Sequence, residues 1–170
     1  MTEEHRAIYR LAANEVEKMD SFRRVKHTAV LVIMFTDVQG SSRRVDMLES
    51  AAVDILPELH RKFAEIVERN NGGRFIKDEG DATMSVFSEP STAVERALEL
   101  QQYTFDFNKQ RPGEPPVLIR IGLHLGQVVV KDELAADALG SNVSIAWRVQ
   151  SLADGGHTYM TETVFRDAQR

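Results

Sequence analysis

The sequence contains no cysteine, so neither a disulfide framework nor a thiolate metal site is possible. It also has no excess of positive charge. The formal net charge of −5 argues against nucleic acid as a bulk partner. No apolar run is long enough to span a bilayer, and the first residues carry mixed charges rather than a signal peptide. These absences predict a cytoplasmic protein without nucleic acid as a partner and without membrane contact by this segment.

What remains is the composition of an ordinary globular protein. The chain of 170 residues is long enough for one domain with a full core. Its 42% hydrophobic and 28% charged content is that of a globular protein. Residues 3–20 carry apolar side chains at helical spacing, and residues 20–28 are polar and basic. We therefore divide the chain into an N-terminal helix and linker, 1–28, and a main domain, 29–170. The helix is either a connector from an upstream regulatory domain or a lid on the core.

The main domain alternates strand and helix patterns. Residues 29–35 form a continuous, β-branched-rich run that is typical of a strand buried on both faces. The other predicted elements are a helix at 52–67, a hairpin of 74–77 and 81–87, a helix at 91–108, strands at 117–125 and 127–130 that meet at Gly126, a helix at 141–152 and a strand at 157–160. The apolar face predicted for the 91–108 helix consists of Ala93, Ala97, Leu98, Leu100 and Phe105. This order predicts an α+β fold with a ferredoxin-like split βαββαβ sheet and helices on one face.

Polar segments follow several of these elements. Asp37 ends the first strand and leads into a turn and helix start, whose free N–H groups suit phosphates, although a plain N-cap would look the same. Asp81 follows a glycine at the hairpin tip. In a βαββ unit the first strand and the hairpin lie side by side, so Asp37 and Asp81 are expected to meet. Adjacent carboxylates repel unless a cation bridges them, which predicts a two-metal phosphoryl-transfer site for Mg²⁺ or Mn²⁺.

Together the segments resemble the class III adenylyl/guanylyl cyclase family, from about residue 30 to residue 163. The motifs that carry the resemblance are Phe35-Thr36-Asp37 with Gly40 and Ser41, then Lys77 with Gly80 and Asp81, then Ile119 to Gly126, then Asp137, Gly140, Val143, Ala146 and Arg148. The resemblance implies that residues 29–170 are a cyclase catalytic domain with cyclase-type additions to the core. It also implies a homodimer whose active sites draw residues from both chains.

The resemblance implies that the metal ions, two per active site, are held by Asp37, Asp81 and the backbone carbonyl of Val38. The turn after Asp37 would bind the triphosphate through Val38, Gln39, Gly40 and Ser41. In this reading the ribose 3′-hydroxyl attacks the α-phosphate, so that ATP gives 3′,5′-cyclic AMP and pyrophosphate.

The remaining matched residues imply which base is read. Lys77 and Asp137 would be the base-reading pair, and a donor beside an acceptor is complementary to N1 and the N6 amino group of adenine. Guanine reverses both groups, so ATP is the predicted substrate. Arg148 would stabilise charge on the transferring phosphoryl group.

Ser144 departs from the family pattern, which has a ribose-orienting asparagine at this position. The shorter serine side chain leaves open a second interpretation, a cyclase-like regulatory module that binds nucleotide with little turnover. A diguanylate cyclase or polymerase palm shares the predicted fold but is disfavoured by the hairpin tip, which reads Asp78-Glu79-Gly80-Asp81.

His124 matches a family histidine, yet a lone histidine within a buried strand predicts a structural role. The match ends after 157–160, before the closing strands usual in the family, which leaves open whether the C-terminus is truncated.

Overall fold

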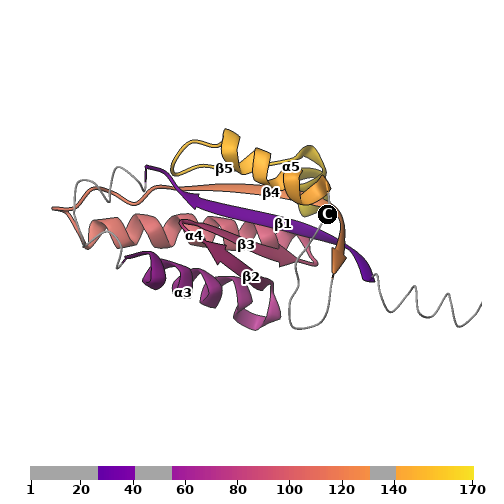
Figure 1. The fold of residues 1–170 in the computed structure, drawn as a ribbon, viewed down its shortest axis with the longest axis horizontal. Helices are drawn as coiled ribbons and strands as arrows, with labels where there is room; N and C mark the ends of the chain where they lie inside the picture. Colours follow the sequence, from indigo (N-terminus) through magenta and orange to yellow (C-terminus); the bar gives the residue numbers. More distant parts are fainter. Residues whose placement is uncertain (1–26, 41–54, 131–140) are drawn as a thin grey trace, which may run out of the picture.

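The computed structural model describes residues 27–40, 55–130 and 141–170 (Figure 1). Its elements are β1 (His27–Val38), α3 (Ile55–Glu68), a short 3-10 turn (Arg69–Asn71), β2 (Arg74–Glu79), β3 (Ala82–Phe87), α4 (Pro90–Lys109), β4 (Ile119–Val130), α5 (Ser141–Leu152), β5 (Thr158–Met160) and α6 (Glu162–Ala168). The helix predicted at 3–20 lies outside the described residues, so the proposed division at residue 28 stays a prediction.

The five strands form one sheet in the order β2-β3-β1-β4-β5. The central strand β1 is antiparallel to both β3 and β4, and β5 adds to the edge parallel to β4. The first four strands have the order of a split βαββαβ sheet, which confirms the predicted α+β fold. The first strand is longer than its apolar run, because pairing with β4 continues from His27 through to Val38.

Alternate residues of β1 divide the core into two layers. Val32 and Met34 belong to the larger cluster under α3 and α4, whereas Ile33 and Phe35 belong to a smaller cluster that includes Ala146 of α5. Figure 1 shows α3 and α4 on one side of the sheet and α5 on the other. The expectation of helices on one face therefore holds for α3 and α4, while α5 covers part of the opposite face because that face is also apolar.

Two details of the predicted elements were wrong. Residues 119–130 form a single strand that continues through Gly126. The glycine does not break the strand; it makes room for α5, since an added Cβ would lie 2.3 Å from Asn142 Cγ. On α4, the predicted apolar positions Leu98 and Phe105 are 61% and 55% exposed. The buried face keeps the predicted Ala93, Ala97 and Leu100 and adds Arg96, Thr104 and Phe107.

Within the described ranges, no helix has the length and apolar content needed to cross a membrane.

Gly122 sets the distance between β4 and α5. A Cβ built on it would lie 2.2 Å from the backbone nitrogen of Gln150, far inside any normal contact. The helix therefore packs directly on the strand backbone, and any side chain at Gly122 would push α5 away from the sheet.

We predict that Gly122→Ala destabilises the fold by about 1–3 kcal/mol, the usual cost of overpacking a tight contact. The urea midpoint of unfolding should fall accordingly. Gly113→Ala is the matched control, because an added Cβ at Gly113 meets nothing within 4 Å. Equal shifts in the two variants would show that the contact with α5 does not constrain the fold.

Candidate active site

The strand register brings the predicted acidic pair together. Asp37 pairs with Ala82 on one side and with Arg120 on the other. Asp81 immediately precedes Ala82 in the tight turn of the β2–β3 hairpin, and its carboxyl lies close enough to share a hydrogen bond with that of Asp37. The two aspartates, 44 positions apart in the sequence, thus meet at the end of the central strand, as the βαββ order predicts.

The environment of Asp37 works against its ionised form. Burial, with 7% of the residue exposed, is the largest influence and raises the pKa of its carboxyl above the ordinary value. A hydrogen bond and the positive charge from Arg120 oppose this effect, whereas the charge of Asp81 adds to it. Gln150 of α5 also donates to the same carboxylate oxygen at 3.4 Å. Two ionised carboxylates here would carry more negative charge than the single Arg120 beside them balances.

A β-bulge determines which side chains of β2 enter the site. The pairing with β3 shifts between Phe75 and Lys77, leaving Ile76 as an extra residue. Phe75 packs with the core under α3, and Ile76 with the cluster on the opposite face. Lys77 then pairs with Met84, which lies on that opposite face. Without the bulge, the alternation of side chains would place Lys77 on the same face as Phe75. The bulge instead turns the predicted base-reading lysine to the opposite face.

Asp78, the next residue, lies on the α3 side of the hairpin. Its Oδ2 is 3.2 Å from Nδ1 of His60, a residue of α3 that is only 8% exposed. This contact links α3 to β2 immediately beside the bulge. It supports the register in which Lys77 faces away from α3.

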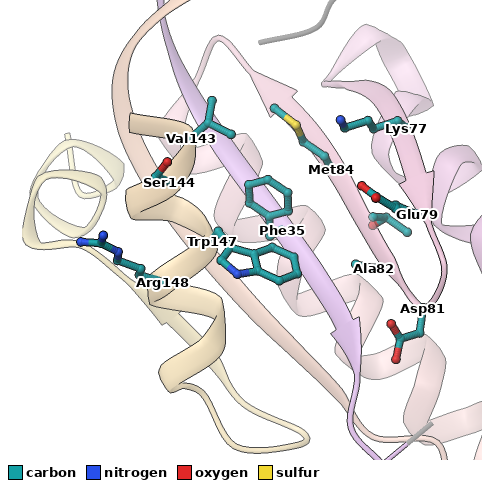
Figure 2. Close-up of a pocket in the computed structure, with 11 residues that line it drawn as sticks. Phe35, Lys77, Glu79, Asp81, Ala82, Met84, Val143, Ser144, Trp147 and Arg148 are labelled. Carbon is teal, nitrogen blue, oxygen red and sulfur yellow. The ribbon is translucent and has the colours of Figure 1, made fainter. Parts of the chain in front are cut away.

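A pocket of about 840 Å³ lies between the hairpin and α5. Its lining residues are Phe35, Lys77, Glu79, Asp81, Ala82, Thr83, Met84, Val143, Ser144, Trp147 and Arg148. Figure 2 shows Lys77, Glu79 and Asp81 on the hairpin side, Ser144 and Arg148 on α5, and aromatic rings between them. The rings of Phe35 and Trp147 meet edge to face, with centroids 5.3 Å apart. The pocket thus has an apolar middle and polar side chains on two sides.

Arg148 and Asp81 lie on opposite sides of this pocket. In Figure 2 the guanidinium of Arg148 extends from α5 away from the hairpin, and Ser144 lies one turn earlier on the same helix. Both residues are exposed. One chain alone therefore does not aim Arg148 at the acidic pair.

The predicted triphosphate turn is described in part. Val38 is 4% exposed and packs in the core, so only its backbone faces the turn. The amide of Gln39 donates to the carbonyl of Leu118 at 2.8 Å and is already engaged in the sheet. Gly40 adopts a positive φ of 70°, which glycine tolerates in a turn. Ser41 and Asp137 lie outside the described residues.

His124 has partners that fit the predicted structural role. Its Nδ1 lies 3.2 Å from Thr161 Oγ1, and its Nε2 lies 3.0 Å from Asn142 Oδ1. The ring thereby joins β4 to α5 and to the start of α6. It is absent from the pocket lining.

Sequence reasoning assigned no role in the site to Arg120, Gln150 or Glu79. Arg120 lies between two buried isoleucines, and alternation alone places it on the opposite face of β4. Its register with Asp37 could not be read before strand pairing was known. Glu79 stands two residues after Lys77, so the same alternation would have placed it in the pocket once the bulge was recognised.

The donor set at Asp37 and Asp81 fits a hard divalent cation. Carboxylate oxygens are the ligands that Mg²⁺ and Mn²⁺ prefer, and such ions commonly take their remaining ligands from phosphate and water. Among the residues that the structure describes, no group of three or more His, Cys, Asp or Glu side chains could hold a metal ion. A metal at the pair therefore needs substrate or water oxygens.

Fold and site define the class of protein, which is a ferredoxin-like α+β domain with paired carboxylates at the end of its central strand.

The family follows from comparison with known proteins. The model of the adenylate and guanylate cyclase catalytic domain matches residues 24–169, and the chain belongs to that family. A relative from Rhizobium meliloti (strain 1021), "Putative adenylate cyclase 3", is 29% identical over 132 residues, covering 78% of this chain and 22% of that protein. Serine/threonine-protein kinase pkn2 of Myxococcus xanthus is 26% identical over 134 residues, covering 79% of this chain and 16% of that protein.

Solved structures agree on the fold. The adenylyl cyclase CyaB from P. aeruginosa matches with a TM-score of 0.77 at 21% identity, over 85% of this chain and 82% of that chain. The monomeric guanylyl cyclase domain of the RhoGC fusion protein from Blastocladiella emersonii matches with a TM-score of 0.73 at 20% identity, over 85% and 88% of the two chains. Adenylyl and guanylyl cyclases match alike, so this fold does not by itself determine which nucleotide is bound.

We predict opposite effects of Asp37→Asn on stability and on metal response. In the folded protein the raised pKa means that ionising Asp37 costs stability as pH rises above its ordinary value of 3.8. In metal-free buffer at neutral pH the variant should therefore unfold at a higher temperature than the wild-type chain, with the difference closing toward pH 3.8.

Thermal unfolding with and without Mn²⁺ checks this account. Mn²⁺ should raise the unfolding temperature of the wild-type chain but not that of Asp37→Asn, since ligands that bind the native state stabilise it. Asp154→Asn, at an exposed position outside the pocket, is the control and should respond like the wild type. An equal Mn²⁺ response in Asp37→Asn would remove Asp37 from the metal site.

Proposed function

We propose that this domain is an adenylate cyclase, which converts ATP to 3′,5′-cyclic AMP and pyrophosphate at two sites in the interface of a homodimer. Membership of the cyclase family supports the reaction class. The observation that carries the dimeric site is the opposed placement of Arg148 and the acidic pair on one chain. A second chain, related by a two-fold axis, would bring its Arg148 to the acidic pair of the first.

Each proposed role follows from the chemistry of the side chain. Asp37 and Asp81 would hold Mg²⁺ or Mn²⁺ together with the carbonyl of Val38. When bound, such ions lower the pKa of the ribose 3′-hydroxyl and offset charge on the phosphates. Arg148 of the second chain would stabilise the charge that develops on the α-phosphate as pyrophosphate leaves.

Arg120 of β4 supports binding of the triphosphate beside the acidic pair. Arg120 lies beside Asp37 and adds a fixed positive charge next to the proposed phosphate position. The amide of Gln39 is bonded to Leu118, so binding by this turn would use the side chain of Gln39 and the residues from Gly40 onward. The positive charge of Arg120 would favour phosphate oxygens bound next to this turn.

The preference for ATP over GTP rests on the base-reading pair. Lys77 lines the pocket as a hydrogen-bond donor, and Asp137 is proposed as the acceptor for the amino group. Guanylyl cyclases share the fold, so the preference would depend on these two residues.

Ser144 supports a second candidate, a regulatory domain that binds nucleotide with little turnover. It is exposed and lines the pocket on α5, where the family has a longer amide side chain. A serine hydroxyl would need a bridging water to reach a ribose that an asparagine could contact directly. Measured turnover distinguishes the candidates.

Mixing two inactive variants tests the shared site. Asp81→Ala and Arg148→Ala should each form no cyclic AMP alone. A heterodimer of the two carries one site with both lesions and one intact site. Activity should return to about a quarter of the wild-type value if the two chains associate at random.

Subunit exchange must be shown separately, for example by fluorescence transfer between labelled chains. If exchange occurs and cyclic AMP still does not form, the two-chain site is wrong. A mixture of Asp81→Ala with Asp37→Ala is the matched control, because both lesions fall on the same side of the proposed site and no site is intact.

We predict that Ser144→Asn raises kcat by about tenfold, because orientation of the ribose acts mainly on the transition state. KM should change less. Ser151→Asn, on the same helix but outside the pocket lining, is the control and should leave both constants unchanged. A kcat that stays the same or falls would show that this site orients the ribose in another way.

A further inference from the structure

Glu79 is an ionisable pocket residue to which the proposed reaction gives no role. It lies on β2 between Lys77 and Asp81, and all three line the pocket. Lys77 pairs with Met84 and Glu79 with Ala82 in regular register, so both side chains lie on the same face of the hairpin. A carboxylate therefore accompanies the proposed base-reading lysine on that face.

The β-bulge at Ile76 turns both of these charged residues to the pocket face. Because it shifts the alternation of every later residue of β2, it turns Lys77 and Glu79 toward the pocket and Asp78 toward His60. Figure 2 shows both end groups extending from β2 into the pocket, toward the side of Met84 and Phe35. Strand alternation keeps the donor and the acceptor on one face, and this single backbone irregularity turns that face toward the pocket.

The position of Glu79 separates it from the metal chemistry. Asp37 and Asp81 interact with each other, but across the described ranges no third acidic or histidine side chain joins them in a group able to hold a metal. Glu79 is therefore not part of a metal-binding group with the acidic pair, and it shares its face of the hairpin with Lys77.

An ammonium beside a carboxylate matches one edge of adenine, where the N1 acceptor is adjacent to the 6-amino donor. Guanine presents an oxygen at the 6-position, which the carboxylate would repel. We propose that Glu79 accepts a hydrogen bond from the 6-amino group of the substrate while Lys77 donates to N1, so that Glu79 helps to select adenine. This inference rests on the proposed function. The amino group carries two hydrogens, so Glu79 and Asp137 can both accept from it.

The test pairs a change in the protein with the same change in the ligand. The ligands are 3′-deoxy-ATP and the 3′-deoxy triphosphate of purine riboside, which lacks the 6-amino group. Neither has the attacking hydroxyl, so neither turns over. Binding with Mn²⁺ is measured by calorimetry on the full chain, using Glu79→Met, which keeps the length but removes the acceptor. Glu95→Met, on the exposed face of α4 and outside the pocket lining, is the matched control.

Glu79→Met should weaken the adenine ligand by about tenfold or more, the usual range for a lost hydrogen bond to a charged group. The ligand without the amino group should bind the variant and the wild-type chain alike. Glu79→Gln retains a neutral acceptor and should give an intermediate loss. Glu95→Met should change neither affinity.

Equal weakening of both ligands by Glu79→Met would overturn the inference, because Glu79 would then act on the pocket or on Lys77 and not on the amino group. Unchanged binding of both ligands would overturn it as well. A failure of the proposed function appears differently, in the unmutated chain: a wild type that binds neither ligand and forms no cyclic AMP would contradict the function and the inference together.

Discussion

The antiparallel pairing of β1 with β3 and β4 fixes which charged groups meet at the end of the central strand. Asp37 lies opposite Ala82 and Arg120, and through Ala82 it is brought next to Asp81. A slip of one residue would turn Asp37 toward α3 and α4, into a layer made of apolar side chains. An ionised carboxylate there would be strongly unfavourable, so the burial of Val32 and Met34 on one face also keeps Asp37 on the other.

Two local irregularities adapt this sheet to a binding site. The bulge at Ile76 turns Lys77 and Glu79 onto the face that carries Asp37. The absence of a side chain at Gly122 lets α5 approach β4 closely enough for Gln150 to reach Asp37. The site consequently depends on backbone geometry as much as on the charged residues themselves, and the net electrostatic cost of ionising Asp37 is what a divalent cation would offset.

The sequence predicts the fold well where a single local signal decides. The buried run at 29–35 and the helix at 141–152 follow from residue type and spacing, and the meeting of Asp37 with Asp81 follows from the βαββ order. Errors arose where tertiary contacts override such signals. Gly126 resembles a strand break but accommodates Asn142, and the exposed Leu98 is apolar without belonging to the buried face of α4.

The pattern of residue types along the sequence could not predict cross-strand pairs or backbone irregularities. The partnership of Arg120 with Asp37 needs the register of two strands, and the pocket position of Glu79 needs the bulge. Asp137 and Ser41 carry expectations drawn from family resemblance alone.

The most direct measurement is product analysis of the purified chain with Mn²⁺ and ATP or GTP. The account predicts equimolar cyclic AMP and pyrophosphate from ATP in preference to GTP. Preferential formation of cyclic GMP from GTP, or no cyclic nucleotide from either substrate, would contradict it.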